Sequence, residues 1–171
     1  VCSSDLESEK KEIIQGYLDL VYLNKPPEKI KVGPRSFIGP SSVSLELENI
    51  RASSEQDNIV NITKNYTVTD KADGVRKLLY IHKDGKLYLI DMNMKVQFTG
   101  TNTNNKSLYN SIYDGEHILF DKKGNFINLF ACFDIYFDNK KDLRSLPLVD
   151  SAENPFRLKH LQENVNTMRL A

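Results

Sequence analysis

The feature that most constrains the fold is a run of short apolar segments separated by turn residues. Residues 76–92 show it most clearly: they read RKLLYIHKDGKLYLIDM, two apolar stretches on either side of Asp84-Gly85. Asp-Gly between two such stretches indicates a β-hairpin, because glycine takes the positive φ that a two-residue turn requires. Strands joined by a hairpin are antiparallel, so the sequence predicts an antiparallel sheet in the middle of the chain.

Further segments with strand character surround this hairpin. The expected strands are residues 43–50, 66–70, 76–82, 86–92, 96–101, 116–121 and 126–137. Lys-Lys-Gly-Asn at residues 122–125 predicts the turn between the last two. A helix is expected near the end, with Asn154 as its N-cap and Pro155 as its first residue. Its apolar stripe comprises Leu158, Leu161, Val165 and Met168.

The start of the chain predicts another helix. Its apolar residues recur at helical spacing and are Ile13, Ile14, Tyr17, Leu18 and Val21. The segment NKPPEK at residues 24–29 ends this helix, because proline lacks the amide hydrogen and clashes with the preceding turn. We therefore expect an N-terminal helical segment and linker at residues 1–31 and a β-rich domain at residues 32–171. The fold class is α+β, a twisted and mainly antiparallel sheet with flanking helices.

Composition sets wide limits on function. The 23 basic and 23 acidic residues cancel, so any nucleic-acid surface must be a local patch. Cys2 and Cys132 form neither a disulfide framework nor a metal-binding motif, which favours a reducing compartment. No apolar run approaches the roughly 18 residues of a membrane span, and the acidic start is no signal peptide. The sequence predicts a cytoplasmic protein that is neither secreted nor held in a membrane.

The segment TDKADGVR, residues 69–76, places Lys71 two residues before Asp73-Gly74 and Arg76 two residues after that pair. A solvated lysine beside a hairpin turn has the same local sequence. Average residue usage produces Lys-x-Asp-Gly by chance in roughly one chain in thirty of this length, and the added arginine lowers this to on the order of one in several hundred. The motif is therefore informative mainly together with others.

Two such motifs follow in order. SIYDGEHI, residues 111–118, contains Asp-Gly-Glu with Glu116 expected to open a strand. NLFACFDIYF, residues 128–137, contains Phe130-x-x-Phe133-Asp134 within an apolar run. The phenylalanines are also what a buried strand would carry, whereas a carboxylate in such a run needs a partner because its burial is costly.

This ordered set resembles the covalent nucleotidyltransferases, which include the mRNA capping guanylyltransferases and the ATP-dependent DNA and RNA ligases. Longer phrases resemble the guanylyltransferase region of capping enzymes from large DNA viruses, and this likeness spans roughly residues 36–160. The phrases are SVSLELENI, YTVTDKADGVRKLLYI, KLYLIDMNMKVQFTGT, SIYDGEHI and CFDIYF with KDLRSLPL. The resemblance implies a partial nucleotidyltransferase core, of the ligase or ATP-grasp-like type, within residues 32–171.

The resemblance also implies roles for individual residues. Lys71 would attack the α-phosphate of a nucleoside triphosphate, forming a phosphoramidate and releasing pyrophosphate. Asp70 and Arg76 would bind the nucleotide, with Arg76 at the ribose. Glu116 would accept a hydrogen bond from the ribose or hold the metal, Mg²⁺ or Mn²⁺. The aromatic ring of Phe130 would stack on the purine, which hardly distinguishes GTP from ATP.

Asp134 is a second expected metal ligand, and the remaining expectations concern the complete reaction. The substrates would be GTP and the 5′-diphosphate end of RNA. Triphosphatase and methyltransferase domains would lie on the same or an associated chain, and a viral protein would work in the viral factory or the virion. The family's later acidic and Lys-x-Lys motifs and its OB-fold lid are absent up to Ala171. We therefore expect feeble or no reaction from these residues alone.

Two alternatives stay open at this point. The first is the adenylation domain of an ATP-dependent polynucleotide ligase, because the Lys-x-Asp-Gly-x-Arg motif does not select the nucleotide. The second is a catalytically degenerate module that keeps the β scaffold as a binding or assembly surface.

Overall fold

The computed structural model describes residues 3–23, 31–51, 60–150 and 154–168. The chain divides into two compact units. The larger unit comprises Val1–Gly39 and Ala72–Ala171, and the smaller unit is Pro40–Lys71. Within the described residues, no helix is long and apolar enough to cross a membrane.

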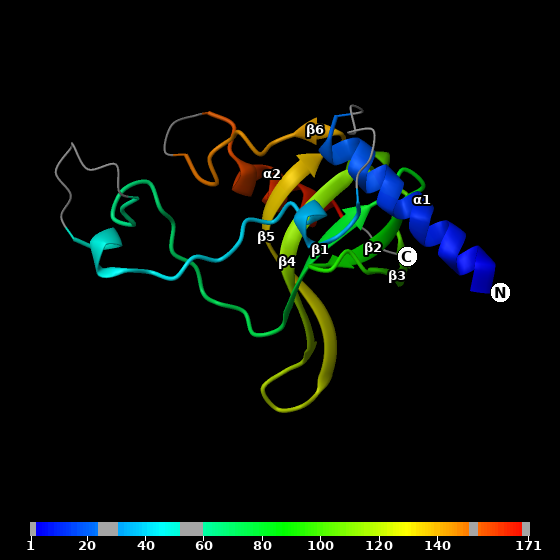
Figure 1. Cartoon of the computed structure of the whole chain (residues 1–171), viewed down its shortest axis with the longest axis horizontal. Coiled ribbons are helices and arrows are strands. Elements are labelled where there is room, and N and C mark those ends of the chain that lie inside the picture. The colour runs from blue at the N-terminus through cyan, green and yellow to red at the C-terminus, as the bar shows by residue number, and fades with distance from the viewer. Residues whose placement is uncertain (1–2, 24–30, 52–59, 151–153, 169–171) are drawn as a thin grey trace. The chain divides into compact units, whose positions relative to one another are not determined.

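The larger unit is built on one six-stranded sheet with the strand order β3-β2-β1-β4-β5-β6 (Figure 1). All strand pairs are antiparallel. The strands are β1 (Val75–Ile81), β2 (Lys86–Asp91), β3 (Val96–Asn102), β4 (Ser111–Phe120), β5 (Phe126–Asp138) and β6 (Lys141–Asp142). With two helices beside it, this sheet confirms the α+β class predicted from the sequence.

Both predicted hairpin turns form, and each loop has three residues. For the loop between β1 and β2 the sequence predicted a two-residue turn at Asp84-Gly85. The Gly85 amide donates to the carbonyl of His82 at 3.0 Å, and Gly85 follows at φ +86°. The His82 amide then donates to the carbonyl of Lys86 at 3.0 Å and closes the loop. A β-turn followed by a residue with positive φ is the usual three-residue hairpin, and glycine takes that conformation without strain. Gly124, at φ +83°, occupies the same place between β4 and β5.

Strand β4 begins five residues earlier than the sequence predicts. Glu116 therefore lies in the interior of a ten-residue strand and does not open it. Position 115 of this strand requires glycine, because a Cβ atom there would lie 2.6 Å from the carbonyl oxygen of Ala131 and 2.7 Å from the ring of Phe130. The Asp-Gly pair in β4 thus marks close contact between two strands instead of a turn.

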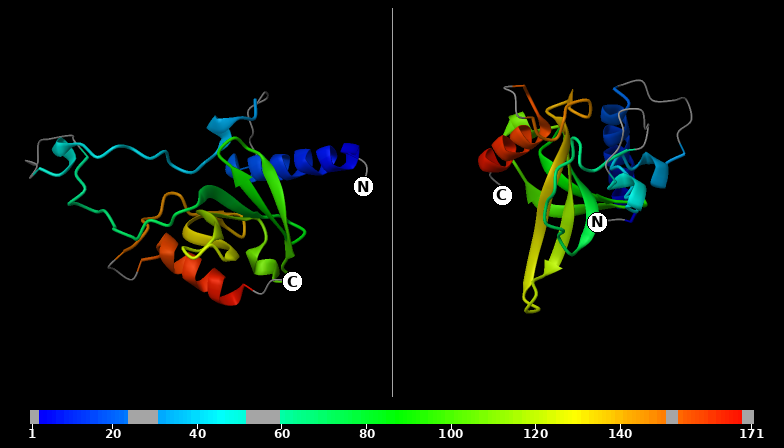
Figure 2. Two further views of the ribbon diagram at one scale, coloured as in Figure 1. Left: turned by 90° about the horizontal axis from the view of Figure 1, so that it is seen from below. Right: turned by 90° about the vertical axis from the view of Figure 1, so that its left-hand side faces the viewer.

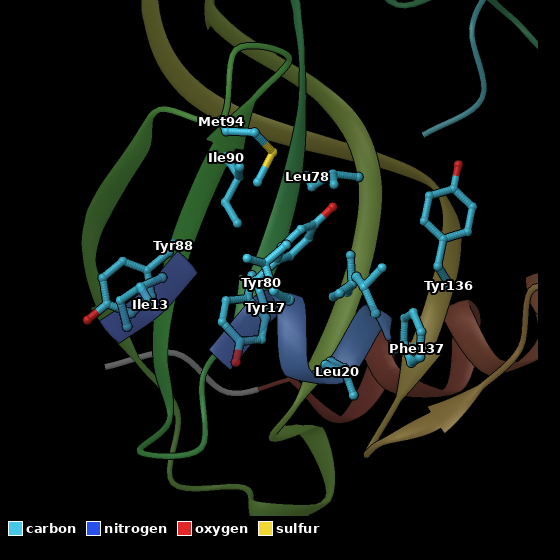
Figure 3. Packing of buried hydrophobic residues seen from close by; sticks show 13 residues of the cluster. Ile13, Tyr17, Leu20, Leu78, Tyr80, Tyr88, Ile90, Met94, Tyr136 and Phe137 are labelled. Carbon is cyan, nitrogen blue, oxygen red and sulfur yellow. The ribbon is translucent and has the colours of Figure 1, made fainter. Parts of the chain in front are cut away.

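Helix α1 (Ser3–Val21) covers one face of the sheet (Figure 2). Its buried side chains pack on alternate residues of β1 and β2, and Tyr17 meets Tyr80 edge to face with ring centroids 6.2 Å apart (Figure 3). The buried members of this cluster are Ile13, Tyr17, Leu18, Leu20, Val21, Leu78, Tyr80, Tyr88, Ile90, Met94, Ile112, Tyr136 and Phe137. The predicted helix at the start is confirmed, and residues 24–30 of the predicted linker lie outside the described residues.

Helix α2 (Arg157–Thr167) covers the opposite face, where Leu161 is buried beside Leu79 and Leu158 packs against the same cluster. The predicted cap at Asn154-Pro155 is wrong, because the helix begins two residues after the proline. The amides of Arg157 and Leu158 instead donate to the carbonyls of residues 147 and 148, each at 3.0 Å. Tertiary partners therefore satisfy the free amides of the first turn in place of a capping side chain.

The smaller unit contains one 3₁₀ turn, η2 (Leu47–Asn49), and no strand among its described residues. The strands predicted at residues 43–50 and 66–70 are therefore wrong. Their apolar side chains, such as Val43 at 90% exposure and Val68 at 99%, have no buried face to occupy. Alternating apolar residues form a strand only where a partner strand and a covering layer are present.

Candidate functional site

The site is built around Arg76, which the sheet holds in a fixed orientation. Arg76 lies on β1, and its Nε and Nη2 donate to the two carboxylate oxygens of Asp114 on β4, at 3.1 and 2.6 Å. Asp114 is fully buried, and burying a carboxylate is costly unless it is paired and hydrogen-bonded. The hydrogen bonds that Arg76 donates to Asp114 raise the pKa of Arg76 above its ordinary value.

A third strand completes the support of this ion pair. The hydroxyl of Tyr136 on β5 donates to Oδ2 of Asp114 at 2.5 Å. Burial, followed by the charge of Asp114, raises the pKa of Tyr136, so the hydroxyl keeps its proton and remains a donor. Three neighbouring strands thus each contribute one member of a Tyr136–Asp114–Arg76 chain of hydrogen bonds.

Two aromatic rings flank the guanidinium of Arg76. Its central carbon lies 5.6 Å from the ring centroid of Phe37 and 5.9 Å from that of Phe133. At these distances the ring faces attract the cation. Gly39 leaves room for the arrangement, because a Cβ atom there would lie 2.7 Å from Nη2 of Arg76.

Glu116 lies directly across from Arg76 in the β1–β4 register, so the two side chains emerge on the same face of the sheet. Glu116 is half-buried, and its carboxylate has no hydrogen bond or ion pair within the described part of the chain. A free carboxylate beside an anchored guanidinium can accept hydrogen bonds from hydroxyl groups or bind a cation.

An Asp-Gly pair usually indicates a hairpin turn, but Asp73-Gly74 does not form one. It forms a bend that leads directly into β1. A Cβ atom on Gly74 would lie 2.6 Å from the carbonyl oxygen of His117 and 3.0 Å from Cγ of Glu116. Glycine is therefore needed here for the close approach of the incoming chain to β4.

Lys71 and Asp70 belong to the smaller unit, where they are exposed and lie outside any helix or strand. Neither side chain has a hydrogen bond or ion pair among the residues that the structure describes. Along the chain, Lys71 precedes Arg76 by five residues. The amine of Lys71 therefore has no structural partner among the described residues.

The structure does not bring Phe130 to the face that carries Arg76. Phe130 packs with the buried cluster beneath α2, and it lines a cavity of about 390 Å³ together with Leu87 and Leu89. Phe133, three residues later, is the member of the Phe-x-x-Phe pair whose ring contacts Arg76. Residues three apart in a strand emerge on opposite faces, so the rings of Phe130 and Phe133 do not share one face.

Asp134 is held in a structural ion pair. Both of its carboxylate oxygens accept hydrogen bonds from Arg157 at the start of α2, at 2.8 and 3.0 Å. Arg157 also donates to the carbonyl of Leu146, so this pair fixes α2 to β5. The sequence anticipated that a carboxylate in this run needs a partner, and Arg157 is that partner.

The residues present allow a Mg²⁺ or Mn²⁺ ion that is shared with a nucleotide. No group of three or more His, Cys, Asp or Glu side chains in the described ranges is placed to hold a metal by itself. Mg²⁺ is usually bound through one or two carboxylates together with substrate phosphates, and Glu116 is a carboxylate of this kind. The donor set therefore fits an ion that arrives with a triphosphate.

Sequence reasoning assigned no role to Asp114, Tyr136 or Phe37. Asp114 was visible as the first residue of Asp-Gly-Glu, and its position in an apolar run was the available signal that it needs a buried partner. Tyr136 and Phe37 carried no such signal, because their contacts depend on strand pairing and on a loop 39 residues before Arg76 in the sequence.

The fold and the site together define the general class of the protein. An α+β domain with an antiparallel sheet, flanked by helices and carrying Arg76 and Glu116 side by side, is consistent with a nucleotidyltransferase-type domain.

Comparison with known proteins gives the family. The model of the family described as "mRNA capping enzyme, catalytic domain" matches residues 4–171. The chain therefore belongs to the mRNA capping enzyme catalytic domain family. A "Probable mRNA-capping enzyme" of Acanthamoeba polyphaga mimivirus is 34% identical over 102 residues, which cover 59% of this chain and 8% of the relative. The matched residues thus span less than a tenth of the length of that relative.

Proposed function

We propose that the complete protein is an mRNA guanylyltransferase. It forms a covalent lysyl-GMP intermediate from GTP and transfers GMP to the 5′-diphosphate end of RNA. The observation that carries this proposal is that Arg76, anchored on Asp114, lies directly opposite Glu116, whose carboxylate has no partner among the described residues. Membership of the capping enzyme family and the exposed Lys71, five residues before Arg76, support the same function.

The first chemical step takes place at Lys71. Its amine, after losing a proton to solvent, attacks the α-phosphorus of GTP. A phosphorus–nitrogen bond forms, the bond from the α-phosphorus to the bridging oxygen breaks, and pyrophosphate leaves with the electron pair. In the second step an oxygen of the RNA diphosphate attacks the same phosphorus. The bond to nitrogen then breaks, and the lysine amine recovers its electron pair and a proton.

Arg76 and Glu116 bind the nucleotide in this proposal. The positive guanidinium attracts the negatively charged nucleotide and donates to the ribose, while Glu116 accepts a hydrogen bond from the ribose or holds the metal. Asp70, exposed beside Lys71, is a further polar contact for the nucleotide. Mg²⁺ or Mn²⁺ would neutralise charge on the triphosphate and on the departing pyrophosphate.

For base stacking, the geometry favours Phe133 over Phe130. Phe133 is 38% exposed and contacts Arg76, whereas Phe130 packs beneath α2 on the other face. Stacking is worth about 1–3 kcal/mol per base, so Phe133→Ala should raise the KM for GTP by roughly 5- to 150-fold. Phe130→Ala is the matched variant, and it should lower stability with little effect on KM. A rise in KM for Phe130→Ala alone would return the stacking role to Phe130.

The test of the function is covalent labelling with α-³²P-GTP and, separately, α-³²P-ATP in the presence of Mn²⁺. It uses this chain and a longer form that includes any residues encoded after Ala171, each with a Lys71→Ala control. Label from GTP alone that disappears in Lys71→Ala is the expected result for the longer form. Label from ATP would identify a polynucleotide ligase, and no label from either nucleotide would favour a binding or assembly module.

The same proposal covers the partners of the complete protein. GTP and an RNA 5′ end are its substrates, and triphosphatase and methyltransferase activities would lie on the same or an associated polypeptide. The small share of the mimivirus relative that is matched leaves room for such domains.

A further inference from the structure

We propose that Tyr136 is a positioning residue for Arg76, and that it acts through the carboxylate of Asp114. This inference rests on the proposed function, in which the guanidinium of Arg76 contacts bound GTP. Tyr136 itself lies one step away from the nucleotide, so its contribution is to the orientation of a binding group.

Arg76 and Tyr136 share one oxygen atom of Asp114. Oδ2 of Asp114 accepts from Nη2 of Arg76 at 2.6 Å and also from the hydroxyl of Tyr136. The two donors come from β1 and β5, the strands on either side of β4. A carboxylate held only by Arg76 can turn together with it, whereas a second donor from the opposite strand removes this freedom.

The contact between Tyr136 and Asp114 is buried. Asp114 is 0% exposed and Tyr136 is 5% exposed, so water does not replace a hydroxyl that is removed from this place. Removing the hydroxyl leaves Oδ2 with one fewer donor in a buried site, where a lost hydrogen bond costs more free energy than it does in water.

The contacts of Arg76 with the rings and with Asp114 constrain it in different ways. Phe37 and Phe133 flank the guanidinium, but contact with a ring face leaves the cation free to rotate parallel to that face. The hydrogen bonds of Nε and Nη2 to Asp114 define that rotation. A firmly held Asp114 therefore constrains the orientation of Arg76.

The test compares two tyrosine-to-phenylalanine variants of the complete protein. Tyr136→Phe removes the hydroxyl that contacts Asp114. Tyr113→Phe removes an equally buried hydroxyl that accepts from Asn164 of α2, within the cluster on the other face of the sheet. Both variants lose one buried hydroxyl, so a purely structural effect would be similar in the two.

Two quantities are measured at a temperature where all forms are folded. The first is the KM for GTP in the labelling reaction, which we expect to rise about tenfold in Tyr136→Phe, the effect of one hydrogen bond, and to stay unchanged in Tyr113→Phe. The second, by NMR and without nucleotide, is the hydrogen-exchange rate of the Arg76 Nε proton. It should rise about tenfold in Tyr136→Phe alone.

These outcomes separate the inference from the proposed function. Absence of label in the wild-type protein would overturn the guanylyltransferase proposal, and the exchange rate would still decide whether Tyr136 holds Arg76. An unchanged exchange rate in Tyr136→Phe would overturn the inference whatever the labelling shows. Faster exchange with an unchanged KM would also overturn it, since the orientation of Arg76 would then have no bearing on the nucleotide.

Discussion

At the scale of single residues, two arginine–aspartate pairs of similar geometry differ in burial. Asp114 is 0% exposed and pairs with Arg76, whereas Asp142 is 28% exposed and pairs with Arg144. Removing one partner of a buried pair leaves an uncompensated charge, so Asp114→Asn should lower the free energy of unfolding by about 3 kcal/mol. Urea denaturation measures the change. Asp142→Asn is the control and should cost less than about 1 kcal/mol, and equal losses in the two variants would contradict the prediction.

A second residue-scale prediction concerns Cys132, which lies among the side chains packed beneath α2. Burial, with a smaller contribution from the charge of Asp114, raises the pKa of the Cys132 thiol to about 12. The thiolate is the reactive form, so at pH 8 alkylation should be roughly a thousandfold slower in the folded protein than in urea. Because the pKa is raised, the rate should still increase with pH above pH 9. Iodoacetamide labelling of a Cys2→Ser variant measures it, and a plateau near pH 9 would contradict the assignment.

At the scale of elements, the contact between β4 and β5 depends on Gly115. A Cβ atom there would meet the backbone carbonyl of Ala131 at 2.6 Å, so Gly115→Ala requires the two strands to move apart. We expect a loss of about 1–3 kcal/mol in the free energy of unfolding, the usual cost of overpacking. The matched control is Gly33→Ala, because a Cβ on Gly33 meets nothing within 4 Å. Thermal or urea unfolding measures both losses. A larger loss in Gly33→Ala than in Gly115→Ala would show that β5 moves away from β4 at little cost in free energy.

At the scale of the whole molecule, the two units should differ in protection from proteases. The residues Arg51, Lys64 and Lys71 of the smaller unit are exposed and lie outside helices and strands, whereas β1 and β2 are largely buried. Brief digestion with trypsin should therefore cut at these three residues before it cuts the sheet. Mass spectrometry identifies the sites, and a first cut within β1 or β2 would contradict this division.

The same digestion tests the attachment of α1. Ile13 and Tyr17 are buried against side chains of the sheet, so the piece ending at Arg51 should remain associated with the piece beginning at Ala72. Size-exclusion chromatography under native conditions measures the association. Separation of the two pieces would show that α1 contributes little to the stability of the larger unit.

Local sequence signals predicted much of the fold. Alternation and turn residues located β1, β2, β3 and β5, because a hairpin is specified by neighbours in sequence. Periodicity predicted both helices for the same reason. The failures have two causes. Residues 43–50 and 66–70 have strand-like sequences but no partner strand among the described residues. At α2, carbonyls of residues 147 and 148 accept hydrogen bonds from the first amides, and the helix begins after Asn154-Pro155.

For the candidate site, the sequence by itself supplied the ordered motif set and with it Lys71, Arg76 and Glu116, whose spacing along the chain needs no coordinates. The tertiary structure decided which of these side chains share a face. Glu116 lies opposite Arg76, and Asp134 forms an ion pair with Arg157. Phe133 contacts Arg76, whereas Phe130 lies on the opposite face of the sheet. The tertiary structure also added Asp114 and Tyr136 as supports. The physical reason is that strand register, which depends on pairing between distant segments, determines which side chains of neighbouring strands lie together on one face.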